Sequence, residues 1–168
     1  MPGMTVVFGS KNGSTAEVAG WIAECLREHD PHVELAQGRS ALVRDRSARP
    51  GPGRDRRALY AGRWHRDAHR FLRRNRAELT GVPVAVFAMG PWADTEESWQ
   101  RSRVQLDRAL ARYDWLKPVS VAVFGGVDPK AGSSGVRRDL RDRAVIERWA
   151  DQVAAGLVRR PSLTCLNV

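Results

Sequence analysis

The chain lacks any apolar run long enough to cross a membrane, and it contains few cysteines. Its longest apolar run, Val82 to Met89, suits a buried strand, whereas a transmembrane helix needs about 20 residues. Cys25 and Cys165 are too few for a disulfide framework. The sequence does not begin with a basic segment followed by an apolar one, so we expect no signal peptide. These absences predict a cytoplasmic protein without a transmembrane segment and leave peripheral membrane association open.

Lysine is also scarce, although the net charge is +9. Of the 28 basic residues, 25 are arginine and three are lysine. A nucleic-acid surface would not exclude lysine, because both side chains neutralise phosphate; this bias is more typical of a GC-rich coding sequence. The aromatic residues are not interleaved with arginines as in stacking platforms, and no known nucleic-acid motif is present. A basic nucleic-acid-associated protein stays an alternative, but we do not expect nucleic acid as a partner.

Apolar patterns of two kinds alternate along the 168 residues, which are enough for one domain with a buried core. Short apolar runs predict strands at 4–8, 32–35, 82–88 and 118–124. Helical spacing of apolar residues predicts helices at 16–28, 64–79, 96–113 and 143–157. The runs 82–88 and 118–124 are almost wholly apolar, which is typical of strands covered on both faces. The alternation predicts an α/β protein with a doubly wound parallel sheet and ligand-binding loops at the carboxyl ends of its strands.

A turn rich in hydroxyls and glycine lies between the first predicted strand and helix. Its residues are Ser10, Lys11, Asn12, Gly13, Ser14 and Thr15. Backbone N–H groups and hydroxyls at the positive end of a helix dipole bind phosphate. Alternatively, Ser14 or Thr15 simply caps the helix, but a cap needs only one such side chain. The turn has more hydroxyl and amide side chains than a cap needs, which favours a phosphate site. The spacing of its glycine, lysine and hydroxyl residues is neither that of a Walker A loop nor that of the dinucleotide fingerprint.

Residues 8–19, Phe-Gly-Ser-Lys-Asn-Gly-Ser-Thr-Ala-Glu-Val-Ala, resemble the first loop of the flavodoxin family, which wraps the phosphate of FMN. Residues 59–72, 91–99 and 124–129 resemble flavodoxin-like proteins related to menaquinone-dependent protoporphyrinogen oxidase. The resemblance implies a sheet of order 2-1-3-4-5 with FMN bound by the loops after strands one, three and four. The implied cofactor-binding residues are Ser10, Lys11, Asn12, Gly13, Ser14, Thr15, Tyr60, Ala61, Gly62, Arg63, Trp64, Met89, Gly90, Pro91 and Trp92.

The same resemblance implies an FMN-dependent oxidoreductase that exchanges electrons with a quinone or another small molecule. FMN would carry the chemistry, so the sequence identifies no catalytic residue. Tyr60, Trp64 and Trp92 are the candidates for an aromatic wall beside the flavin ring. The positive net charge would stabilise a reduced, anionic flavin, which favours a dehydrogenase over a low-potential electron shuttle. The oligomeric state is not indicated.

The expected central strand has no good candidate. Residues 36–57 are irregular and rich in Arg, Pro and Gly; proline cannot donate to a central ladder, and buried unpaired arginines are costly. We therefore expect a domain over 1–160 whose third strand is degenerate or missing, followed by a tail at 161–168. Segment 36–57 is either an out-of-frame translation or an insertion that loops out. A flavodoxin-like relic or binding module without catalytic activity is thus a second alternative.

Two polar groupings have simpler explanations than chemistry. His65 and His69 are four residues apart on a predicted helix, but without a third ligand nearby we predict no metal site. Asp94, Glu96 and Glu97 are expected to favour a helix N-terminus rather than to act as an acid–base pair.

Overall fold

The computed structural model describes residues 4–9, 13–37, 66–128, 137–157 and 163–167 of the chain. Within them, all strand pairings in the sheet are parallel. The strands are β1 (Met4–Phe8), β2 (Val33–Gln37), β3 (Val84–Met89), β4 (Ser120–Phe124) and β5 (Leu163–Asn167). The helices are α1 (Ser14–His29), α2 (Arg66–Arg74), α3 (Arg76–Thr80), α4 (Glu96–Leu110) and α5 (Arg143–Leu157). The expectation of a mixed α/β protein with parallel strands is therefore confirmed.

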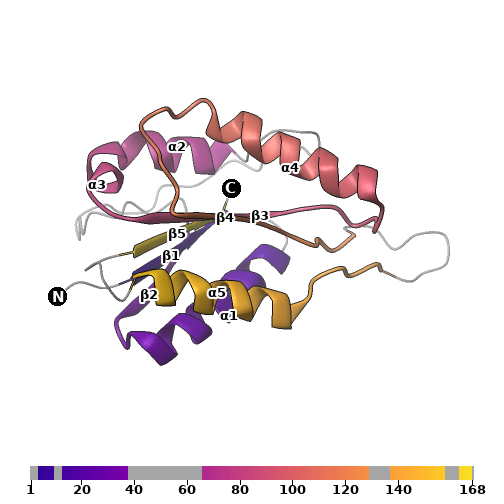
Figure 1. The fold of residues 1–168 in the computed structure, drawn as a ribbon, viewed down its shortest axis with the longest axis horizontal. Coiled ribbons are helices and arrows are strands. Elements are labelled where there is room, and N and C mark those ends of the chain that lie inside the picture. Colours follow the sequence, from indigo (N-terminus) through magenta and orange to yellow (C-terminus); the bar gives the residue numbers. More distant parts are fainter. Residues whose placement is uncertain (1–3, 10–12, 38–65, 129–136, 158–162, 168) are drawn as a thin grey trace, which may run out of the picture.

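The strands form one sheet in the order β2-β1-β5-β3-β4. Helices α1 and α5 cover one face of this sheet, and α2, α3 and α4 cover the other (Figure 1). Successive residues of a strand point to opposite faces. Accordingly, Val6 of β1 packs into the core beneath α1 and α5, while Val7 packs into the core beneath α2 and α4. Phe87 and Val86 of β3 divide between the two cores in the same way.

An aromatic cluster anchors α5 to the sheet. Phe87 of β3, Phe124 of β4 and Trp149 of α5 are buried together, and the rings of Phe124 and Trp149 meet edge to face with centroids 5.5 Å apart. Such pairs add about 0.5–1.5 kcal/mol to the burial of their apolar area. The indole nitrogen of Trp149 donates a hydrogen bond of 2.9 Å to the hydroxyl of Ser120, so its polar atom is satisfied despite burial.

The helix predicted over 64–79 is interrupted at Asn75, between α2 and α3. Asn75 is buried, and its side-chain amide donates to the carbonyl of Phe71 at 2.8 Å. Asparagine side chains compete in this way with the helical ladder, which explains why the helix bends here. The bend allows the chain to turn from α2 into β3 while Leu72 and Leu79 stay in the same core.

The central strand differs from the expectation. The place beside β1 expected for the third strand is taken by β5, which pairs with β1 on one side and with β3 on the other. Residues 161–168, expected to be a tail, thus contain a strand in the middle of the sheet. The backbone of Leu163–Asn167 contains no proline and can supply ladder groups on both sides. The segment 36–57 lies outside the described residues, except that Ala36 and Gln37 end β2.

The expectation that residues 118–124 form a strand covered on both faces is wrong. β4 lies at an edge of the sheet and pairs only with β3 among the described strands. Val121 is 44% exposed and Val119, just before the strand, is 49% exposed. An apolar run alone does not distinguish an edge strand from a central one, because β-branched residues favour both. In contrast, β3 is buried along almost its whole length, as predicted.

Candidate functional site

The loops after β1 and β3 lie near a topological switch point of the sheet, where the chain connections lead to opposite sides. From β1 the chain passes through α1 to β2, outward on one side of the sheet. From β3 it passes through α4 to β4, outward on the other side and over the opposite face (Figure 1). In open α/β sheets, ligands bind outside the carboxyl ends of the strands at such a switch point. The turn after β1 and the loop after β3 flank it, with β5 between them.

The turn after β1 starts helix α1 with a glycine. Gly13 is the N-cap and has φ of 77°, a left-handed conformation that an L side chain rarely adopts. Its carbonyl accepts the first helical hydrogen bond, from Glu17 N–H at 2.9 Å. Ser14 and Thr15 lie inside the helix, half-buried, so neither is the N-cap residue. The first N–H groups of α1 therefore point out of the helix end without a helical partner. Ser10, Lys11 and Asn12 lie outside the described residues.

The loop after β3 packs tightly against the end of β4. Gly90 N–H donates to the carbonyl of Phe124 at 2.6 Å, and Gly126 N–H donates to that of Pro91 at 2.8 Å. A Cβ on Gly90 would lie 2.7 Å from a methyl of Val123, and one on Gly126 would lie 2.6 Å from the carbonyl oxygen of Gly90. These approaches require glycine at both positions. The surface formed by residues 90–91 and 124–126 is called the ledge below.

The predicted residues of this loop have different environments. Met89 ends β3 and packs against the core beneath α1 and α5, and Pro91 is buried. Trp92 is 38% exposed, so a large aromatic surface faces solvent beside the ledge. The group Tyr60, Ala61, Gly62, Arg63 and Trp64 lies outside the described residues.

The loop after β4 reaches back to the first turn of α1 through Arg141. The guanidinium of Arg141 contacts the carboxylates of Asp139 at 2.6 Å and Glu17 at 2.5 Å, and it lies over the ring of Trp21. Only 12% of the Arg141 side chain is exposed. The hydrogen bond to Asp139, followed by that to Glu17, raises the pKa of Arg141, and the same guanidinium lowers the pKa of Asp139. This fixed cation holds the loop against the helix start.

The acidic segment before α4 acts as predicted, at a helix N-terminus. Thr95 is the N-cap, and its hydroxyl accepts a 3.2 Å hydrogen bond from Ser98 N–H. Glu96 and Glu97 occupy the first turn, where their charge is favourable. Asp94 accepts a hydrogen bond from the indole of Trp99 at 2.8 Å. No acid–base role is needed to explain these carboxylates.

Of the two histidines considered as a metal pair, only His69 is among the described residues. His69 hydrogen-bonds Tyr113 through Nδ1, and His65 lies outside the described residues. The described residues also contain no cluster of three or more His, Cys, Asp or Glu side chains able to hold a metal ion.

Sequence reasoning missed two side-chain clusters that the fold assembles from distant segments. Arg141 meets Glu17, and His69 meets Tyr113, across long stretches of chain. Neither pair shows a local spacing, so no pattern in the sequence indicates them. Gly13 is different, because a glycine between a predicted strand and a predicted helix is a local signal for the left-handed turn that the structure has there.

Comparisons of this chain with protein-family models and with curated protein sequences found no match. Among the described helices, none is both long enough and apolar enough to traverse a lipid bilayer.

Proposed function

We propose that this chain is a flavodoxin-like protein that binds FMN at the carboxyl edge of its sheet and exchanges electrons with a quinone or another small molecule. The start of α1 carries this proposal. It combines a left-handed Gly13, outward N–H groups and two hydroxyl residues, Ser14 and Thr15, at the switch point of a parallel sheet. A helix start of this kind favours a terminal phosphate, because its N–H groups and dipole both attract negative charge.

The arrangement of the strands supports the proposal. The resemblance leads us to expect β1 beside a central strand, with β3 and β4 beyond it. β5 takes that central place, so the sheet continues from β2 to β4. This continuity weighs against the alternative of a relic whose function was lost with its central strand. For the alternative of a nucleic-acid-associated protein, none of the described residues at this edge offers comparable support.

In the proposed complex, FMN would lie across the loops after β1 and β3. Ser14, Thr15 and the first N–H groups of α1 would hold the phosphate, while Trp92 and the backbone near Gly90 would border the ring. Flavin rings prefer flat apolar walls together with backbone hydrogen bonds at the polar edge. When bound, FMN supplies one- and two-electron redox chemistry. The protein would orient the ring, and its net charge of +9 would favour a reduced, anionic flavin.

The phosphate assignment is tested by the double variant Ser14→Ala/Thr15→Ala. FMN titrated into the purified protein is followed by the yellow absorbance that remains with the protein after gel filtration. Loss of charge-assisted hydrogen bonds, about 1.5–3 kcal/mol each, predicts affinity reduced by roughly tenfold or more.

Thr80→Ala is the matched control, because the Thr80 hydroxyl is exposed and bonds only its own helix, at the carbonyl of Arg76. FMN affinity in this variant should equal that of the wild type. Equal affinity in the double variant and the wild type would contradict the phosphate assignment. A wild-type protein that retains no FMN would contradict the proposed function itself.

The ring assignment is tested by tryptophan fluorescence. FMN should quench the wild-type emission, and Trp92→Phe should remove a measurable part of that quenching, because energy transfer and contact quenching need proximity. Trp115→Phe is the control, since Trp115 packs beside Tyr113 beyond the end of α4, far along the chain from the ledge. Undiminished quenching in Trp92→Phe, with FMN bound, would contradict the placement of the ring beside Trp92.

A further inference from the structure

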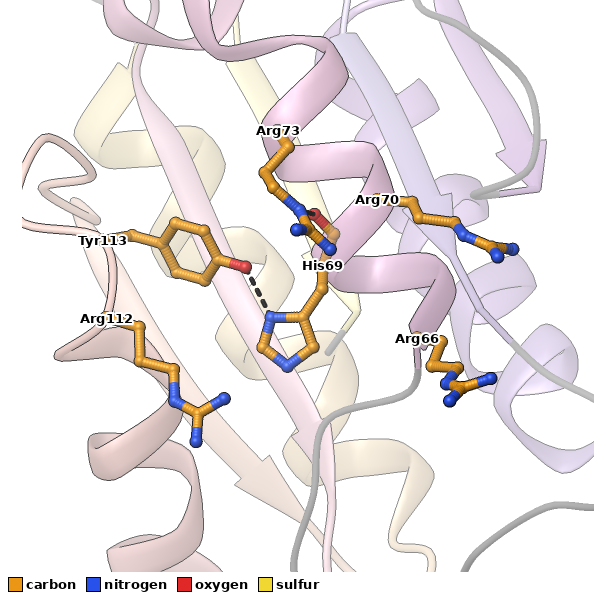
Figure 2. Close-up of a pocket in the computed structure, with 6 residues that line it drawn as sticks. All are labelled: Arg66, His69, Arg70, Arg73, Arg112 and Tyr113. Atoms are coloured by element: carbon orange, nitrogen blue, oxygen red, sulfur yellow. Dashed lines mark hydrogen bonds between the residues drawn. The ribbon is translucent and has the colours of Figure 1, made fainter.

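A second concave site lies away from the carboxyl edge, between α2 and the turn after α4. Its volume is about 440 Å³, and its lining consists of Arg66, His69, Arg70, Arg73, Arg112 and Tyr113 (Figure 2). After Tyr113 the chain enters the amino end of the sheet, where Val119 N–H donates to the carbonyl of Val84. The wall of the cavity at Tyr113 therefore lies toward the amino end of the sheet, and no acidic residue is among the six that line the cavity.

A histidine–tyrosine pair forms the centre of the cavity. Nδ1 of His69 is hydrogen-bonded to the hydroxyl of Tyr113. Burial, followed by the charges of Arg112 and Arg73, lowers the pKa of His69, and burial raises the pKa of Tyr113. This bond holds the imidazole against the phenol group, whichever of the two donates the hydrogen. Figure 2 shows Nε2 turned away from Tyr113, on the side of the Arg112 guanidinium.

Arginines from two segments surround this pair. Arg73 and Arg112 flank it from opposite sides, and Arg66 and Arg70 project from α2 farther out (Figure 2). The Nε of Arg73 donates to the backbone carbonyl of His69 at 3.3 Å, which fixes the base of its guanidinium. Within the described part of the chain, no carboxylate forms an ion pair with Arg66, Arg73 or Arg112. A concave surface lined by one sign of charge concentrates ligands of the opposite sign.

We propose that this cavity binds the phosphate group of a small molecule. Guanidinium groups match phosphate oxygens with paired N–H donors. The cavity volume lies within the range of small-molecule sites. A nucleic acid fits less well, because the Tyr113 ring is buried and its hydroxyl is bonded to His69, which leaves no exposed aromatic face for stacking at this pair.

The test uses inorganic pyrophosphate as the probe, at constant ionic strength, with the full chain. Calorimetry measures affinity, and side-chain NMR of the imidazole follows His69. Wild-type protein should bind pyrophosphate with a shift of the His69 signals. The variant Arg73→Gln/Arg112→Gln should weaken binding by roughly tenfold or more, since two charge-assisted contacts are removed.

Arg74→Gln/Arg108→Gln is the matched control. It removes the same charge from the same two neighbourhoods, α2 and α4, through exposed arginines that do not line the cavity. Its affinity for pyrophosphate should stay within about twofold of the wild type, the change expected of distant surface charges. FMN binding should be equal in both double variants, which separates this site from the proposed cofactor site.

Three results would overturn the proposal. Equally weakened pyrophosphate binding in both double variants would mean that net charge, and not contact within the cavity, determines the affinity. Pyrophosphate binding that leaves the His69 signals unmoved would place the anion elsewhere. A His69 response to an oligonucleotide but not to pyrophosphate would assign the cavity to nucleic acid instead.

Discussion

At the scale of single residues, Gly13 and Gly20 form a matched pair in and beside α1. A Cβ would meet no atom within 4 Å at either position. They differ in backbone conformation, because Gly13 has φ of 77° and Gly20 is helical. We therefore expect Gly13→Ala to destabilise the fold by about 1–2 kcal/mol through left-handed strain. Gly20→Ala should stabilise it by roughly 0.5–1 kcal/mol through helix propensity.

Urea denaturation of both variants beside the wild type measures these two changes. Opposite signs would tie the difference to φ alone, since space is open at both positions. If Gly13→Ala were as stable as the wild type, the left-handed turn would not be needed to start α1. The case for a constrained phosphate-binding turn would weaken with it.

His69 gives a pH dependence at the same scale. Its pKa in the folded state is lowered from the ordinary value of 6.5 by burial and then by Arg112 and Arg73, while Arg66, Arg70 and Tyr113 also face the cavity. The unfolded state thus binds this proton more readily, so His69 should lower folding stability as pH falls through 6.5. An NMR titration should show His69 titrating below 6.5, and His69→Gln should reduce the loss of stability on acidification. A His69 midpoint above 6.5 would contradict the packing of this cavity.

At the scale of elements, sequence patterns predicted those with a long or strongly apolar signal. The helix expected at 143–157 is α5, with the same bounds, and the strand expected at 4–8 is β1. The break at Asn75 depends on a side-chain hydrogen bond inside a core, which periodicity does not contain. β5 was missed because a five-residue segment near the end of the chain carries no period, and its place is set by pairing with β1 and β3.

The same division applies to the candidate site. Gly13 to Thr15 and Met89 to Trp92 were predicted at one edge of the sheet, because parallel strands bring their carboxyl ends together. The contact of Arg141 with Glu17 joins residues far apart in sequence and needs the folded arrangement of α1 and α5. The position of these two loops could therefore be predicted from the sequence, whereas the long-range ion pair could not.

Removal of β5 provides the prediction at this scale. Deleting residues 163–168 would leave β1 without its pairing to Thr164–Leu166 and would separate β1 and β2 from β3 and β4. We expect the truncated chain to lose its cooperative thermal transition, since both halves would expose unpaired strand edges. A synthetic peptide of residues 161–168 should partly restore the transition. An unchanged melting temperature after truncation would contradict the central position of β5.

At the scale of the whole molecule, the sheet joins two hydrophobic cores, and β5 is the only described strand that connects its halves. Ile22 and Leu72 are each fully buried, one in each core. Ile22→Ala and Leu72→Ala should each cost about 2–5 kcal/mol. Because strands β1 and β3 contribute to both cores, we expect each variant to shift one common unfolding transition.

Circular dichroism and tryptophan fluorescence, recorded on the same samples, distinguish one transition from two. The control is Val145→Ala, at a position of α5 that is 44% exposed, where the change in stability should stay within about 0.5 kcal/mol. Coincident transitions in both core variants would mean that the cores on the two faces of the sheet unfold together. The proposed phosphate cavity on α2 and the proposed FMN site at the carboxyl edge would then belong to one cooperative unit. Two separate transitions, one sensitive only to Ile22 and the other only to Leu72, would mean that the two cores unfold independently, and they would contradict a single cooperative unit.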